Sequence, residues 1–268
     1  MSILRRIVKR VELESRIALP IARKLPDFLI IGAQKGGTTS LYDYLIQHPD
    51  ISSAFRKEVH FFDKNYDRGI SWYKSFFPFR EKVGITGEAS PFYLYHPLVP
   101  KRVKEELGNI KLIVLLRDPV QRTFSHYKME KRRGIEKHSF QEALEMEEQR
   151  LKEGEGKLLS GKFSHNHQFF SYLDRGKYAD QLERWFEIFP RENIYIAKSE
   201  SFFSDPQSTY NEVLHFLGLE PKGAIEFTPL NTDKSRTKIP KENMQFLNQY
   251  FQTENKKLVN LIGDKFSW

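Results

Sequence analysis

The chain has 268 residues, 39% of them hydrophobic and 29% charged, and its mean hydropathy of -0.58 excludes an integral membrane protein. It contains no cysteine, which excludes disulfide bonds, a thiol nucleophile and metal sites built on thiolates. The 43 basic and 35 acidic residues give a formal charge of +8, so the composition favours anionic partners.

Residues 1–26 form a basic N-terminal arm. They carry seven basic and two acidic residues, which leaves a charge of about +3 for residues 27–268 and speaks against a nucleic-acid-binding surface there. Apolar residues such as Ile3, Ile7 and Val8 predict an amphipathic helix over residues 1–25, ended by Pro26. This helix is suited either to peripheral contact with a membrane surface or to packing on its own domain or a partner subunit.

Beyond the arm, short apolar runs alternate with amphipathic stretches. Strands are predicted at 28–31, 59–62, 83–87, 112–116 and 194–197. Helices are predicted at 38–46, 70–77, 97–107, 178–189 and 207–217, after Pro119 and after Pro240. A charged helical excursion at 139–162 contains three glycines that predict a mobile loop, and 222–239 is a polar loop. The alternation predicts one α/β domain over 27–268, with a central parallel sheet flanked by helices.

The segment Gly32-Ala-Gln-Lys-Gly-Gly-Thr-Thr-Ser40 follows the first predicted strand and opens a helix. Glycines let a backbone approach an anion closely, and amides at a helix start favour phosphate. We therefore expect a P-loop-like phosphate site formed by Lys35, Gly36, Gly37, Thr38, Thr39 and Ser40. It is not a Walker A loop, because Lys35 precedes Thr38 by three residues. The plainer interpretation is an ordinary strand–helix turn.

A second anion site is predicted after the strand at 112–116. Arg117 directly follows this strand, and Ser125 lies about two turns into the helix that begins at Pro119. Ligands of open α/β sheets bind at the carboxyl ends of strands, and an arginine fork suits a phosphate monoester. Two neighbouring anion sites indicate a nucleotide phosphorylated at two positions. The alternative is a structural ion pair between Arg117 and Asp118.

These residues resemble a known family. Gly32–Thr39 is similar to the 5′-phosphosulfate loop of sulfotransferases that use 3′-phosphoadenosine 5′-phosphosulfate (PAPS), and Leu116–Ser125 to their 3′-phosphate motif. Three further segments of the chain resemble the heparan sulfate (glycosaminoglycan) branch of the family: Glu58–Asp63, Gly87–Tyr93 and Tyr250–Trp268. The resemblance covers nearly everything from Pro26 onward. It implies a sulfotransferase domain over 27–268 in a bacterial, cytoplasmic enzyme.

The resemblance also implies roles for single residues. Lys35 would contact the bridging region of the phosphosulfate, and residues 36–39 would hold the 5′-phosphate. Arg117 and Ser125 would hold the 3′-phosphate, and Lys234 and Arg236 would close over the cofactor. Glu58 matches the catalytic base of the branch, and His60 matches a nearby active-site histidine.

The implied reaction is metal-free, in-line transfer of the sulfuryl group from PAPS to a hydroxyl or amine, with a carbohydrate expected as acceptor. Adenosine 3′,5′-bisphosphate (PAP) would be the product. Because Glu58 and His60 share a face of the predicted strand, either is able to act as the base. A carboxylate is a weak base, so we expect a partly desolvated site that raises the pKa of Glu58.

Other polar residues have weaker assignments. His165, Asn166 and His167 are read as loop residues rather than metal ligands. Arg175, Lys177 and Tyr178 are candidates for facing the acceptor. Two further functions stay open at this point: a P-loop-like nucleotide kinase, which would require Mg²⁺ and ATP, and a non-enzymatic binder of acidic polymers.

Overall fold

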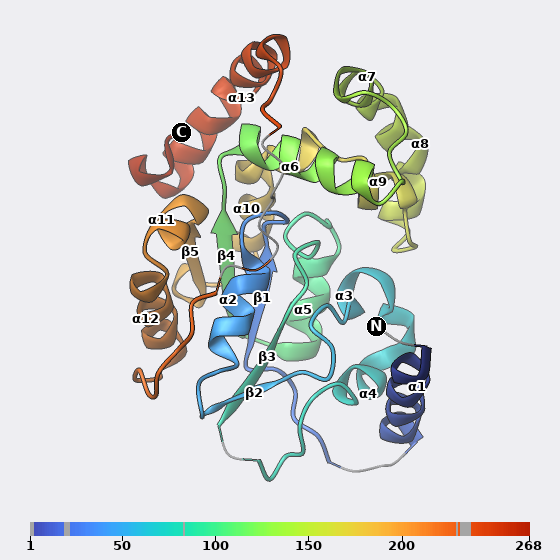
Figure 1. Ribbon diagram of the computed structural model, residues 1–268. Helices are drawn as coiled ribbons and strands as arrows, with labels where there is room; N and C mark the ends of the chain where they lie inside the picture. Colours follow the sequence, from blue (N-terminus) through green and yellow to red (C-terminus); the bar gives the residue numbers. More distant parts are fainter. Residues whose placement is uncertain (1–2, 19–21, 83, 229, 231–236) are drawn as a thin grey trace.

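A computed structural model describes residues 3–18, 22–82, 84–228, 230 and 237–268 (Figure 1). One parallel sheet forms its centre, with the strand order β2-β3-β1-β4-β5. The strands are β1 (Phe28–Gly32), β2 (Ile51–Ser53), β3 (Ile85–Ala89), β4 (Lys111–Leu116) and β5 (Ile194–Lys198). The predicted α/β fold with a central parallel sheet is confirmed.

Helices cover both faces of this sheet. They are α1 (Ile3–Ala18), α2 (Thr38–Leu45), α3 (Phe61–Lys64), α4 (Gly69–Lys74), α5 (Val99–Leu107), α6 (Pro119–Arg132), α7 (Phe140–Glu145), α8 (Glu147–Leu159), α9 (His165–Phe169), α10 (Tyr178–Phe186), α11 (Ser199–Ser204), α12 (Pro206–Leu217) and α13 (Lys241–Ile262). Single 3₁₀ turns lie at η1 (Tyr66–Arg68), η2 (Asp174–Gly176), η3 (Arg191–Asn193) and η4 (Asp264–Phe266).

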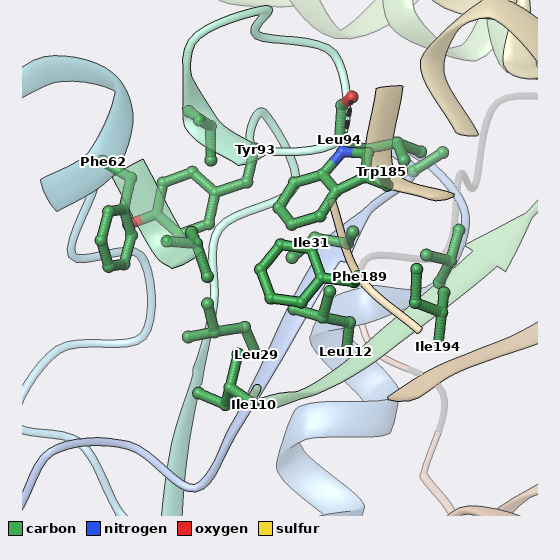
Figure 2. Packing of buried hydrophobic residues seen from close by; sticks show 14 of the residues in the cluster. Leu29, Ile31, Phe62, Tyr93, Leu94, Ile110, Leu112, Trp185, Phe189 and Ile194 are labelled. Atoms are coloured by element: carbon green, nitrogen blue, oxygen red, sulfur yellow. Dashed lines mark hydrogen bonds between the residues drawn. The ribbon is translucent and has the colours of Figure 1, made fainter. Parts of the chain in front are cut away.

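The strand β1 shows how the sheet divides the core. Side chains alternate along a strand, so Leu29 and Ile31 pack with α5, α10 and α13, whereas Phe28 and Ile30 pack with α2 and α12. Figure 2 shows the first of these clusters, in which the Trp185 indole donates a hydrogen bond to the Leu94 carbonyl at 3.3 Å. All five β1 residues are buried, as the apolar run predicts for a strand covered on both faces.

The excursion after α6 is helical rather than a mobile loop. Gly154 and Gly156 both lie within α8, and α9 packs against this helix at Gly154. His165 and His167 belong to α9 and not to a loop, so both of these predictions were wrong. Close packing explains the glycine at residue 154 within a helix, because a Cβ there would lie only 2.6 Å from Ser164 Oγ.

The strand predicted at 59–62 is also wrong, since α3 occupies the end of this segment and the second strand is β2. His60 has a left-handed backbone with a φ of 55°, which a strand does not accommodate. The amides of Val59, His60 and Phe61 bond to side chains from elsewhere in the chain instead of to a sheet. β2 carries a single apolar residue, Ile51, which leaves little periodic signal in the sequence.

The N-terminal helix α1 ends at Ala18, earlier than predicted, and its described side chains contact the domain. Leu13 packs against the core cluster, and the Arg16 guanidinium donates to the carbonyls of Ser75 and Phe77 at 2.8 and 3.1 Å. These contacts favour packing on its own domain, and the membrane contact stays a prediction. Among the described helices, none is long and apolar enough to cross a membrane.

Candidate active site

The loop between β1 and α2 has the conformation of an anion cradle. Lys35 and Gly37 have positive φ values of 73° and 97°, and Gly37 is the residue that precedes the helix. A Cβ on Gly36 would lie 2.4 Å from the Leu115 carbonyl, so only glycine fits there. No side chain in the described part of the chain caps the first turn of α2. Its leading amides are therefore available to an anion, and the loop fits a phosphate group.

The structure brings the two predicted phosphate motifs together. Arg117 lies at the carboxyl end of β4, and its guanidinium donates a hydrogen bond to the Lys35 carbonyl at 3.3 Å. Asp118 caps α6 by accepting from the Val120 amide at 2.9 Å, so its carboxylate serves the helix and not an ion pair with Arg117. Ser125 is half-buried on α6. Parallel strands end at the same edge of the sheet, which is why these segments meet.

The amine of Lys35 is held in a cationic environment. Its Nζ lies 3.8 Å from the Met129 sulfur on α6. Burial, reinforced by the charges of Arg132, Arg117 and Arg133, lowers the pKa of Lys35 to about 8. Excess positive charge at this point prepares the loop for an anionic ligand.

The hydroxyls of the loop have different partners. Thr39 Oγ1 accepts from the Lys57 ammonium at 2.6 Å. Ser40 is buried, and its Oγ accepts from the Leu230 amide at 3.1 Å, so its place in the phosphate site stays a prediction. Lys234 and Arg236 lie outside the described residues.

A carboxylate, an imidazole and a second carboxylate form a chain near this loop. The Glu58 Oε2 atom lies 3.2 Å from His60 Nε2, and His60 Nδ1 lies 2.7 Å from Asp63 Oδ2. The side chain of Glu58 is 44% exposed, that of His60 is 11% exposed and that of Asp63 is fully buried. Glu58 and His60 do not share a strand face as predicted. Instead, the turn that leads into α3 brings the carboxylate of Glu58 and the imidazole of His60 into contact.

The charge states of Glu58 and His60 differ from the prediction. Burial alone would raise the pKa of Glu58, but the hydrogen bond from His60 and the charge of Lys57 outweigh it and lower the pKa to about 2. Burial lowers the pKa of His60, but the charge of Asp63 and the hydrogen bonds with Asp63 and Glu58 together outweigh it and raise the pKa to about 9. The expected rise in the pKa of Glu58 was therefore wrong. At neutral pH Glu58 is a carboxylate and His60 an imidazolium.

The conformation around Glu58 and His60 depends on Glu88, at the end of β3. This fully buried carboxylate accepts from the Val59 amide at 3.0 Å, from Ser90 Oγ at 2.7 Å and from Tyr73 and Tyr93 hydroxyls at 2.8 Å. The Ser90 and Tyr93 oxygens in turn accept from the next two amides, at 3.3 and 2.9 Å. Glu88 thus organises three consecutive amides, a role that the sequence reasoning missed.

Lys57 is a second residue that the sequence reasoning missed. Its ammonium bonds Thr39 Oγ1 at 2.6 Å and lies 3.4 Å from Glu58 Oε1. It therefore joins the phosphate loop to the carboxylate. The available signal was its place directly before Glu58, in the basic pair Arg56-Lys57.

The remaining candidates do not gather at an acceptor surface. Arg175 and Tyr178 are buried, and Lys177 pairs with Asp174 at 3.0 Å. The Tyr178 hydroxyl donates to the Arg117 carbonyl at 2.9 Å. The prediction that these residues face an acceptor is wrong for Arg175 and Tyr178. Within the described ranges, no group of three or more His, Asp or Glu side chains is placed to hold a metal ion.

The fold and this site define an α/β protein with a loop suited to a phosphate group at the carboxyl edge of a parallel sheet. A model of the sulfotransferase domain family matches residues 25–260, and the chain belongs to that family of enzymes. The likeness to the family seen in the sequence motifs is therefore confirmed.

Individual relatives agree with this assignment. The chain is 30% identical to the membrane-associated sulfotransferase kil1 of Dictyostelium discoideum, over 98% of this chain and 71% of that protein. It is 29% identical to heparan sulfate glucosamine 3-O-sulfotransferase 6 of Mus musculus, over 93% and 77%. A sulfotransferase crystal structure from Alicyclobacillus acidocaldarius superposes with a TM-score of 0.70 and 28% identity, covering 90% of this chain and 97% of that one.

Proposed function

We propose that this sulfotransferase moves the sulfuryl group of PAPS to a hydroxyl or amine of a carbohydrate, with Glu58 as the base. The observation that carries the proposal is the Lys57 contact, which joins Thr39 of the phosphate loop to Glu58 at 2.6 and 3.4 Å. Donor loop and proton acceptor thus belong to one bonded unit. The family match leaves no support for the kinase or for the polymer binder.

The donor would be held at both of its ends. The leading amides of α2, with Thr38 and Thr39, suit the 5′-phosphate, and Lys35 suits the oxygen that bridges phosphorus and sulfur. Arg117 and Ser125 suit the 3′-phosphate, since Arg117 already contacts the loop at the Lys35 carbonyl. Lys234 and Arg236 complete the proposed set.

For sulfuryl transfer the protein has mainly to position the two substrates and to stabilise the charge that develops on the leaving phosphate. Sulfuryl transfer resembles phosphoryl transfer, in which a loosely bonded group passes between two oxygens. As the S–O bond of the donor breaks, the Lys35 ammonium neutralises the departing phosphate oxygen. As the new S–O bond forms, the acceptor hydroxyl becomes acidic and its proton passes to Glu58.

The charge states favour Glu58 over His60 as the base. With a pKa of about 9, His60 is protonated on both ring nitrogens at neutral pH and cannot accept a further proton. Its Nε2 instead holds the Glu58 carboxylate at 3.2 Å, and Asp63 holds the other ring nitrogen. His60 therefore orients the base. Proton transfer to Glu58 is late, because a carboxylate with a pKa of about 2 gains a proton only once the acceptor oxygen is bonded to sulfur.

The carbohydrate acceptor is proposed from the relatives. Several are named heparan sulfate glucosamine 3-O-sulfotransferases, at 28 to 29% identity. In this chain the residue after Glu88 is Ala89, whereas the heparan-specific enzymes that its motifs resemble often carry lysine there. A glucosamine-containing glycan with fewer anionic groups is the acceptor class that fits both facts.

Calorimetry tests the donor site directly. PAP should bind tightly, and ADP and ATP–Mg²⁺ should bind weakly. The Arg117→Ala variant should show no heat of binding when it is titrated with PAP. Arg80→Ala is the matched control, since Arg80 is exposed on a turn before β3 at the opposite edge of the sheet. Glu58→Gln should bind PAP normally and lose turnover. Preference for ATP–Mg²⁺, or full turnover in Glu58→Gln, would refute the respective assignment.

A further inference from the structure

Arg175 is a fully buried cation that reaches the phosphate loop from another part of the fold. It belongs to η2 and is 3% exposed. Its Nη1 donates to Gln34 Oε1 at 2.6 Å, and its Nη2 donates to the carbonyls of His167 and Gln168 at 2.6 and 2.7 Å. Gln34 directly precedes Lys35. The side chain therefore spans from the carboxyl end of α9 to the donor loop.

The surroundings leave Arg175 little freedom to move. Its guanidinium lies over the rings of Phe92 and Tyr95, at 4.5 and 5.2 Å from their centroids. Glu147 on α8 accepts from the amides of Leu173 and Asp174, at 2.7 and 2.8 Å. The helical excursion thus holds the backbone that presents Arg175.

The loop itself needs external support. Lys35 has a φ of 73°, a left-handed conformation that is strained for a non-glycine residue. Three anchors from three elements hold successive residues: Arg175 bonds Gln34, Arg117 bonds the Lys35 carbonyl at 3.3 Å, and Ser199 Oγ bonds the Gly36 carbonyl at 2.7 Å. Of these, Arg175 is the one whose backbone is held by the excursion, through the Glu147 contacts with the Leu173 and Asp174 amides.

We infer that Arg175 is a positioning residue that, through Gln34, holds Lys35 in the conformation required for sulfuryl transfer and couples the helical excursion to the donor loop. This inference rests on the proposed function for its kinetic consequence. Arg117 and the α2 amides still hold the phosphates when the Gln34 contact is lost. The loss should therefore slow transfer more than it weakens donor binding.

The test uses Gln34→Ala, Arg175→Lys and the double variant. Gln34→Ala removes the acceptor oxygen with the rest of the side chain beyond Cβ and leaves Arg175 in place. It therefore remains informative if a substitution at buried Arg175 impairs folding. Each single variant should lower kcat about tenfold to a hundredfold with PAPS and a glucosamine-containing oligosaccharide of low sulfate content. The Kd for PAP should stay within about threefold, because a positioning role leaves donor affinity largely intact. The double variant should be no slower than the worse single one.

A matched control and a ligand-free measurement complete the design. Gln149→Ala removes an exposed glutamine on α8 whose amide bonds Glu153 at 3.1 Å, and it should change neither quantity. Hydrogen exchange of the Lys35 to Gly37 amides in the ligand-free protein should be faster in Gln34→Ala.

The outcomes separate this inference from the proposed function. Unchanged kcat and unchanged exchange in Gln34→Ala would overturn the inference, and additive losses in the double variant would overturn the route through Gln34. Failure of the unsubstituted protein to bind PAP would instead refute the proposed function. The exchange experiment would still decide whether Arg175 supports the loop.

Discussion

The buried carboxylate of Asp63 keeps His60 protonated, so Asp63→Asn should return this histidine to ordinary titration. The two side chains meet at 2.7 Å, and an amide would preserve the shape of the contact while removing its charge. Burial is the largest single influence on the pKa of His60, and without the Asp63 charge it is no longer outweighed and disfavours the charged form. The pKa of His60 should fall from about 9 to its ordinary 6.5 or lower.

The size of the effect on stability follows from this shift. Since one pKa unit is worth about 1.4 kcal/mol, the fall corresponds to about 3 kcal/mol. A raised histidine pKa stabilises the folded protein fully below pH 6.5, and this stabilisation is lost as the pH rises through 9. The unsubstituted protein should therefore lose up to about 3 kcal/mol of unfolding free energy over this range, a loss that Asp63→Asn should not show.

Two measurements check the prediction. Imidazole NMR between pH 5 and 10 reports the pKa of His60 in both proteins, and urea unfolding near pH 6 and pH 9.5 reports the loss of stability. Asp67→Asn, a substitution on the exposed η1 turn, is the control. A His60 that still titrates near pH 9 in Asp63→Asn would refute the reasoning, as would a pKa near 6.5 in the unsubstituted protein.

Three further substitutions test the phosphate loop and the turn at Val59 to Phe61. Gly36→Ala should weaken PAP binding at least about tenfold, because its Cβ meets the Leu115 carbonyl at 2.4 Å; Gly156→Ala, with nothing within 4 Å, should leave calorimetric affinity unchanged. Glu88→Gln leaves two buried donors without an acceptor and should lower the unfolding free energy by about 2–4 kcal/mol in urea, whereas a loss below about 1 kcal/mol would contradict this. With the pKa of Lys35 at about 8, PAP binding at pH 8 should take up part of a proton. Calorimetric heats should therefore vary with the ionisation enthalpy of the buffer, and Lys35→Arg should abolish that variation.

Local patterns in the sequence were enough to predict the donor side of the site. The apolar runs at Phe28–Ile31 and Leu112–Leu116 identify two buried strands, because a strand covered on both faces needs apolar residues throughout. In a parallel sheet the segments that follow such strands meet at one edge. The proximity of Arg117 to the loop at Lys35 follows from that rule, without any knowledge of the side-chain contacts.

The conformation around Glu58 and His60 depends on contacts with residues that are distant in the sequence. The turn at Val59 to Phe61 takes its shape from Glu88, Ser90 and Tyr93, about 30 residues further along the chain. Hydrophobic periodicity carries no information about such polar partners, so the segment was predicted as a strand. The pKa of Glu58 was misjudged for the same reason, because burial was foreseen whereas its opposing partners were only partly visible.

By itself, then, the sequence determined the fold class and the family and predicted the phosphate loop, because each of these depends on short local patterns of residues. Only the tertiary structure decided which group holds a proton and what supports the loop. Arg175 illustrates this, because it reaches Gln34 from a position 141 residues away. Charge states and long-range hydrogen bonds depend on the complete surroundings of a side chain, which form only when the whole chain has folded.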